Sequence, residues 1–226
     1  MTDERKGDDA MGNPAVFSVA SKCFSHMDEA AFAELTAPDV WKGFIDDLCV
    51  AIAPRSLYEL LSEREVEALK NPPSYGEYDG FCRRHFTGGL PASAMPVESL
   101  YRADEVAGRT ERGRYGADSA RYMEKLIVSL GLTLPPSYKA WPDHLALELD
   151  MLAVLQRSGC AEEARSFLSE RFGWLADYRQ RLLRLDDPHA AFFIALVDVL
   201  IDAVASEEAD GSSEEGQDRG CDGLPA

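Results

Sequence analysis

The sequence lacks the common motifs of catalytic sites, metal sites and disulfide frameworks. Its five cysteines are odd in number, scattered and without a C-x-x-C pair, which argues against a disulfide framework and a zinc knuckle. Only four histidines are present, and none stands with cysteines at metal-ligand spacing. A P-loop, a G-x-S-x-G elbow, an H-E-x-x-H helix and a Rossmann glycine fingerprint are also missing. Enzyme classes built on these motifs are therefore disfavoured.

Basic charge and long apolar runs are scarce as well. The chain has 23 basic against 40 acidic side chains, a net charge of −17, so its surface should repel nucleic acid and anionic lipid. The most apolar stretch, 190–204, is interrupted by Asp198 and Asp202 and is shorter than the roughly 20 residues of a spanning helix. The polar N-terminus has no apolar signal region. We expect a cytoplasmic chain without stable membrane insertion and without a nucleic-acid partner.

What the sequence does contain is helical periodicity in an ordinary globular composition. Hydrophobic residues make up 46% of 226 residues, enough for one core. Apolar residues recur at helical spacing in segments 14–24, 38–52, 56–61, 118–130, 142–158, 164–172, 174–185 and 193–204. The predicted fold is all-α, a single-domain bundle of about eight to ten helices. We expect residues 1–12 to be a disordered N-terminus, 13–206 the helical domain and 207–226 a disordered acidic tail.

Three local expectations follow from the pattern. Glycines and prolines interrupt segment 71–116, which predicts a long central loop with short helical turns. In the segment that follows, Tyr122, Leu126 and Leu130 should share one apolar face. In the last helix, Asp198 and Asp202 fall opposite the apolar stripe and should face solvent.

Two short segments carry a family resemblance. Pro96-Val97-Glu98-Ser99-Leu100-Tyr101 is similar to the P-x-E-S-(L/V)-Y element of the TorD-like redox-enzyme maturation chaperones. The run from Pro142 to Met151, PDHLALELDM, resembles the family's E-P-D-H-(I/L)-x-x-E-L-E-F-M element, with Trp141 where a glutamate is usual. The chain therefore resembles this family over about residues 14–205.

The resemblance implies an all-helical chaperone, not an enzyme and without a cofactor of its own. Its partner would be the precursor of a molybdopterin oxidoreductase of the dimethyl-sulfoxide-reductase type, bound through its twin-arginine signal peptide and matured before export. An apolar groove would take the hydrophobic run of the leader, and carboxylates its arginines. We expect the two segments to converge on an apolar, negatively charged crevice. The candidate peptide-binding residues are Glu98, Leu100, Tyr101, Trp141, Asp143, His144 and Glu148.

Other interpretations remain open on the residues alone. His144 and Glu148 are four apart in a predicted helix, a spacing that puts both on one face for a metal- or nucleotide-dependent enzyme, although a hydrogen-bonded pair at a helix start is the simpler interpretation. A helical scaffold that binds a folded partner is a further alternative. Arg83-Arg84 is interpreted as ordinary surface. The sequence allows a monomer or an exchanged dimer, and it does not name the client enzyme.

Overall fold

The computed structural model describes residues 14–88, 93–106, 109–113 and 115–214 of the chain. These residues form one helical domain. Its α-helices are α1 (Pro14–Phe24), α2 (Glu29–Leu35), α3 (Pro38–Ala51), α4 (Leu57–Leu60), α5 (Glu63–Lys70), α6 (Tyr75–His85), α7 (Asp118–Ser129), α8 (Leu145–Arg157), α9 (Ala161–Arg171), α10 (Leu175–Leu182) and α11 (Ala190–Glu214). Short 3-10 helices η1 (Glu98–Leu100), η2 (Pro136–Tyr138) and η3 (Phe172–Trp174) lie between them. The all-α class is confirmed.

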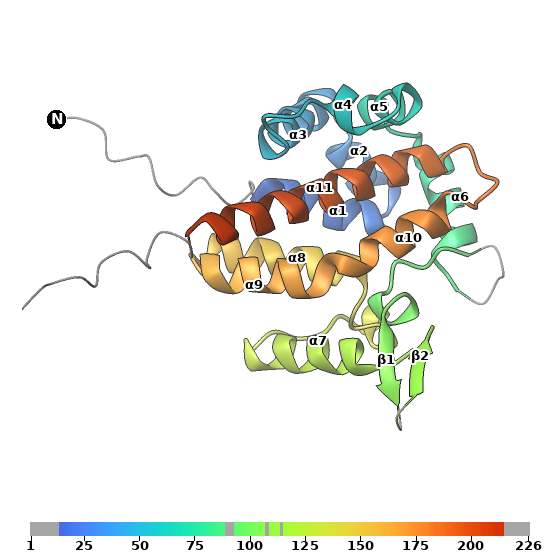
Figure 1. The fold of residues 1–226 in the computed structure, drawn as a ribbon. Coiled ribbons are helices and arrows are strands. Elements are labelled where there is room, and N and C mark those ends of the chain that lie inside the picture. Colours follow the sequence, from blue (N-terminus) through green and yellow to red (C-terminus); the bar gives the residue numbers. More distant parts are fainter. Residues whose placement is uncertain (1–13, 89–92, 107–108, 114, 215–226) are drawn as a thin grey trace, which may run out of the picture.

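The core lies between α1, α8 and α11. Helix α1 packs along α8, while α11 packs against α5, α10 and α9. In Figure 1, α3, α4 and α5 lie on one side of these helices, and α7 lies on the opposite side. Phe193 of α11 stacks on Phe81 at 4.3 Å between ring centroids and contacts Phe24 at 5.8 Å. Aromatic rings thus join the first, middle and last parts of the chain. Within the described residues, no helix has the length and apolarity needed to cross a membrane.

Helix α6 corrects the prediction of a loop over 71–116. Ser74 and Glu77 form a capping box, in which the backbone N–H of Ser74 donates to Glu77 at 2.8 Å. The helix that follows buries Tyr78, Phe81 and Cys82 in the core. Gly76 and Gly80 suggested a break, but the burial of this aromatic face outweighs the cost of about 1 kcal/mol for each helical glycine.

A two-stranded hairpin and α7 form the part of the chain nearest to η1. Strands β1 (Ala103–Val106) and β2 (Arg109–Arg112) are antiparallel, with Ala103 opposite Arg112. They are short and polar, so no apolar alternation announced them. The predicted face of α7 was wrong: Met123 and Ile127 are buried, whereas Tyr122 and Leu130 are 41% and 46% exposed.

The acidic residues of α11 correct another expectation. Asp198 is 8% exposed and forms an ion pair with Arg179, and Asp202 is 4% exposed and forms one with Arg55. Because α5, α9 and α10 all pack against this helix, most of its circumference is covered. Helix α11 also continues to Glu214, so the first part of the expected tail is helical. Residues 215–226 and the expected N-terminal segment 1–12 lie outside the described residues.

Candidate functional site

Residues 96–99, which we call the strap, lie beside the start of α8 and are hydrogen-bonded to it. The backbone N–H of Leu145 donates to the carbonyl oxygen of Pro96 at 2.9 Å, and that of Glu98 donates to the carbonyl oxygen of Asp143 at 3.0 Å. The Asp143 carboxylate also accepts from the backbone N–H of Ser99 at 2.8 Å. The two segments that carried the family resemblance therefore meet, as expected.

His144 directly precedes α8 and is its N-cap. Its backbone is extended, with φ −76° and ψ 136°, and its Nδ1 accepts from the backbone N–H of Ala146 at 3.2 Å. A residue with this backbone is not helical, so the expected shared face of His144 and Glu148 is wrong. The His144 ring lies in the aromatic pocket described next, whereas Glu148 is fully buried in the core.

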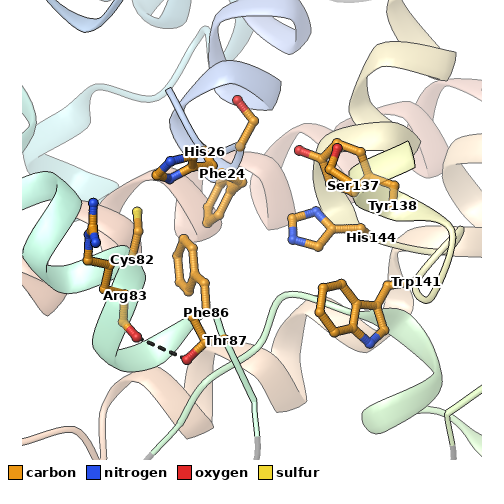
Figure 2. A pocket seen from close by; sticks show the side chains of 11 residues that line it. Phe24, His26, Cys82, Arg83, Phe86, Thr87, Ser137, Tyr138, Trp141 and His144 are labelled. Carbon is orange, nitrogen blue, oxygen red and sulfur yellow. Dashed lines mark hydrogen bonds between the residues drawn. The ribbon is translucent and has the colours of Figure 1, made fainter. Parts of the chain in front are cut away.

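A pocket of about 480 Å³ opens where the end of α1, the end of α6, η2 and the N-cap of α8 meet (Figure 2). We call it the aromatic pocket. Phe24 and Phe86 form one wall, and Tyr138, Trp141 and His144 stand opposite (Figure 2). The remaining lining residues are Ser25, His26, Cys82, Arg83, Thr87 and Ser137. Its shape and apolar walls are those of a site for an apolar ligand segment.

The charge of the aromatic pocket differs from the expected one. None of the described residues that line it is acidic, and one of them, Arg83, is a basic residue. Arg83 donates through Nε to Asp79, one helical turn earlier, at 2.7 Å. The described pocket is therefore apolar, as expected, but it is not the negatively charged crevice that we expected. Carboxylates that could bind an arginine lie outside its walls.

The expected carboxylates form a separate, buried cluster. Glu98 and Glu148 are fully buried and Asp143 is 1% exposed. Glu98 pairs with the guanidinium of Arg171, and the charges of Arg171 and Asp143 both act on Glu148. Arg171 donates to Glu98, and Trp174 Nε1 donates to Glu148 at 3.3 Å. We call Glu98, Asp143, Glu148 and Arg171 the carboxyl cluster. Burial raises the pKa of Glu148 well above its ordinary value, and the charge and hydrogen bond of Glu98 raise it further.

The structure separates the sequence-predicted site residues into three groups. Trp141 and His144 line the aromatic pocket. Glu98, Asp143 and Glu148 belong to the carboxyl cluster, where a bound peptide does not reach them in this conformation. Leu100 and Tyr101 lie at the end of η1, half-buried, and the Tyr101 ring stacks on Trp174 at 5.4 Å between centroids. Tyr101 therefore packs against η3 and α10, and neither Leu100 nor Tyr101 is among the described residues that line the pocket.

Comparison with known proteins now identifies the family. A family model described as nitrate reductase delta subunit matches residues 78–195, more than half of the chain. The chain belongs to this family. A curated relative, the chaperone protein TorD of Shewanella amazonensis, is 26% identical over 200 residues, covering 77% of this chain and 82% of the relative. The TorD-like resemblance found in the sequence is thereby confirmed, and the members of this family are molybdoenzyme maturation chaperones rather than enzymes.

The lining of the pocket also includes residues that the sequence analysis did not predict. Cys82, Arg83, Phe86, Thr87, Ser137 and Tyr138 all lie inside the matched span, whereas Phe24, Ser25 and His26 precede it. In the sequence, the signal for α6 was the capping box of Ser74 and Glu77, followed by Tyr78, Phe81 and Cys82 at helical spacing. No local pattern indicated that the end of α1 would meet η2. Among the described residues, no three His, Cys, Asp or Glu side chains group as a metal site would require.

Proposed function

We propose that this TorD-like chain binds, in the cytoplasm, the twin-arginine signal peptide of a molybdenum-cofactor oxidoreductase and assists maturation of the enzyme before export. The observation that carries the proposal is the aromatic pocket at the N-cap of α8. Most of its walls come from α6 and from the segment that carries the PDH motif of the resemblance, both within the family match, and the rest comes from the end of α1. The cytoplasm is the compartment in which an unexported precursor still has its leader.

The apolar walls favour the hydrophobic run of a leader. Phe24, Phe86, Tyr138 and Trp141 offer rings to apolar side chains, and burial contributes about 25 cal/mol per Å² of apolar area removed from water. A pocket of about 480 Å³ admits a few side chains, not a folded domain. The pocket thus favours a peptide over the folded partner of a scaffold protein.

The leader's arginines need a carboxylate that the pocket walls do not supply. Asp79 binds the lining residue Arg83, and its side chain is 18% exposed, so it is a carboxylate beside the pocket that a peptide could reach. A leader arginine at this edge competes with Arg83 for Asp79. Partial burial makes such a charged hydrogen bond stronger than an exposed pair.

Calorimetric titration of the purified chain with twin-arginine leader peptides of candidate molybdoenzymes tests the proposal. We expect binding that falls at least tenfold in Trp141→Ala and is unchanged in Tyr58→Ala, an aromatic residue that is 65% exposed on α4. Asp79→Asn should weaken preference for arginine over lysine in the leader. If no leader binds, or if enzyme lacking its leader is captured equally well, the proposed function is wrong.

A further inference from the structure

The ring of His144 is held in one orientation at the wall of the aromatic pocket. Its backbone pairs with Val97 in an antiparallel bridge, and its Nδ1 accepts from the backbone N–H of Ala146. Tyr138 packs edge-on against the ring, with 5.0 Å between centroids. Figure 2 shows the other edge of the ring directed into the space between Phe86 and Trp141.

This geometry fixes the position of the ring proton. A nitrogen that accepts an N–H bond carries no hydrogen, so the hydrogen of a neutral His144 is on Nε2. His144 is 6% exposed, and its burial lowers the pKa to about 3, so the ring is uncharged at neutral pH. None of the described residues forms a hydrogen bond with Nε2. A single N–H donor therefore points into an apolar space.

The segment proposed for this pocket carries one kind of acceptor. An apolar run of a leader has no polar side chains, so its acceptors are backbone carbonyl oxygens. Burying such an oxygen without a donor costs roughly 1–3 kcal/mol. The other polar side chains of the lining are those of Ser25, His26, Cys82, Arg83, Thr87, Ser137, Tyr138 and Trp141. Of these, Ser25 already donates to the carbonyl oxygen of Lys22, Arg83 to Asp79, and Thr87 to the carbonyl oxygen of Arg83.

We propose that His144 is a specificity-determining residue, an uncharged donor whose Nε2–H binds a backbone carbonyl oxygen of the apolar peptide segment in the pocket. This role rests on the proposed function. It makes the site selective for a chain whose backbone is still open, as in an extended or unwound segment, and selects against a continuous helix, whose carbonyl oxygens are already paired.

Two substitutions separate the donor from the helix cap. His144→Asn keeps a side-chain acceptor for Ala146 N–H, but its amide is too short to reach into the pocket. His144→Gln places an amide N–H near the position of Nε2. In calorimetry with a leader peptide that binds the unmodified chain, we expect His144→Asn to weaken binding roughly three- to tenfold and His144→Gln to retain most of it. His189→Asn, at a half-buried histidine outside the pocket, is the matched control and should bind normally.

Nuclear magnetic resonance of the histidine rings provides an independent readout. Long-range ¹H–¹⁵N spectra of the full chain should show His144 protonated on Nε2 alone from pH 5 to 8, with Nε2–H moving downfield when leader is added. Protonation on Nδ1, a charged ring at pH 7, or normal binding by a folded His144→Asn chain overturns the inference while the proposed function stands. If no leader binds the unmodified chain, both are overturned. Thermal unfolding establishes that each variant is folded.

Discussion

The Glu98 and Glu148 carboxyl groups are hydrogen-bonded to each other in the interior, and Arg171 at the end of α9 pairs with Glu98. Two carboxylates next to one buried arginine cannot both keep their charge cheaply. The raised pKa of Glu148 means that it holds its proton in the folded chain and donates it toward Glu98. The contact between Glu98 of η1 and Glu148 of α8 therefore includes the carboxyl proton of Glu148.

Glu148→Gln should show how this proton affects stability. The ordinary pKa of the carboxyl is 4.5, so above that pH the unfolded chain releases a proton that the folded chain retains, and the stability of the native chain falls as pH rises. Glutamine offers the same donor without this dependence. We expect the variant's free energy of unfolding to gain roughly 1–3 kcal/mol on the native chain between pH 5 and pH 8. Urea unfolding at several pH values measures this. A difference that stays constant with pH contradicts it. Glu124→Gln, at an exposed residue of α7, is the control for replacing a carboxyl group by an amide.

Arg171→Met should be among the most damaging single changes to the fold. The guanidinium side chain is 8% exposed and its partner Glu98 is fully buried, so the substitution leaves a buried charge with only Arg102 beside it. We expect a loss of about 3–5 kcal/mol in the free energy of unfolding, measured by denaturant titration. Arg102→Met, at a side chain that is 44% exposed, is the control and should cost about 0–1 kcal/mol. Equal losses in the two variants would refute the distinction.

Asp202→Ala tests the corrected position of α11. Because Asp202 is 4% exposed and binds Arg55, we expect a loss of roughly 1–3 kcal/mol on unfolding in urea. Had the side chain faced solvent, the change would lie within about 0.5 kcal/mol. Asp46→Ala removes an exposed ion pair with Lys42 and supplies that reference. A cost for Asp202→Ala no larger than that of Asp46→Ala would argue against the buried placement.

The sequence predicted the fold class because helical periodicity is local. Phe17, Ala20 and Phe24 are all buried as their spacing indicated, and Leu145, Leu149 and Leu152 have no exposed surface. It failed where the neighbours decide the outcome. The face of α7 and the burial of Asp198 depend on which helices pack against them, and a hydrophobic pattern does not contain that information.

The candidate site was predictable only in part, for a related reason. The motif identified the strap and the N-cap of α8, so His144 and Trp141 were found. The same motif also carried Glu98 and Glu148, and residue type alone does not distinguish a carboxylate that binds a peptide from one that is buried beside an arginine. The opposite wall comes from α1 and α6, more than 50 residues away in the chain, and only the folded structure brings it into place.

The aromatic pocket has one wall that belongs to the core and one that does not. Phe24 and Phe86 both contact Phe193, at 5.8 and 5.1 Å between centroids, so altering either ring disturbs the packing of α11. Ser137 and Trp141, in contrast, stand on the short connection between α7 and α8, outside the buried aromatic cluster. Substitutions at Ser137 or Trp141 should therefore change the lining of the pocket without disturbing the aromatic packing on α11.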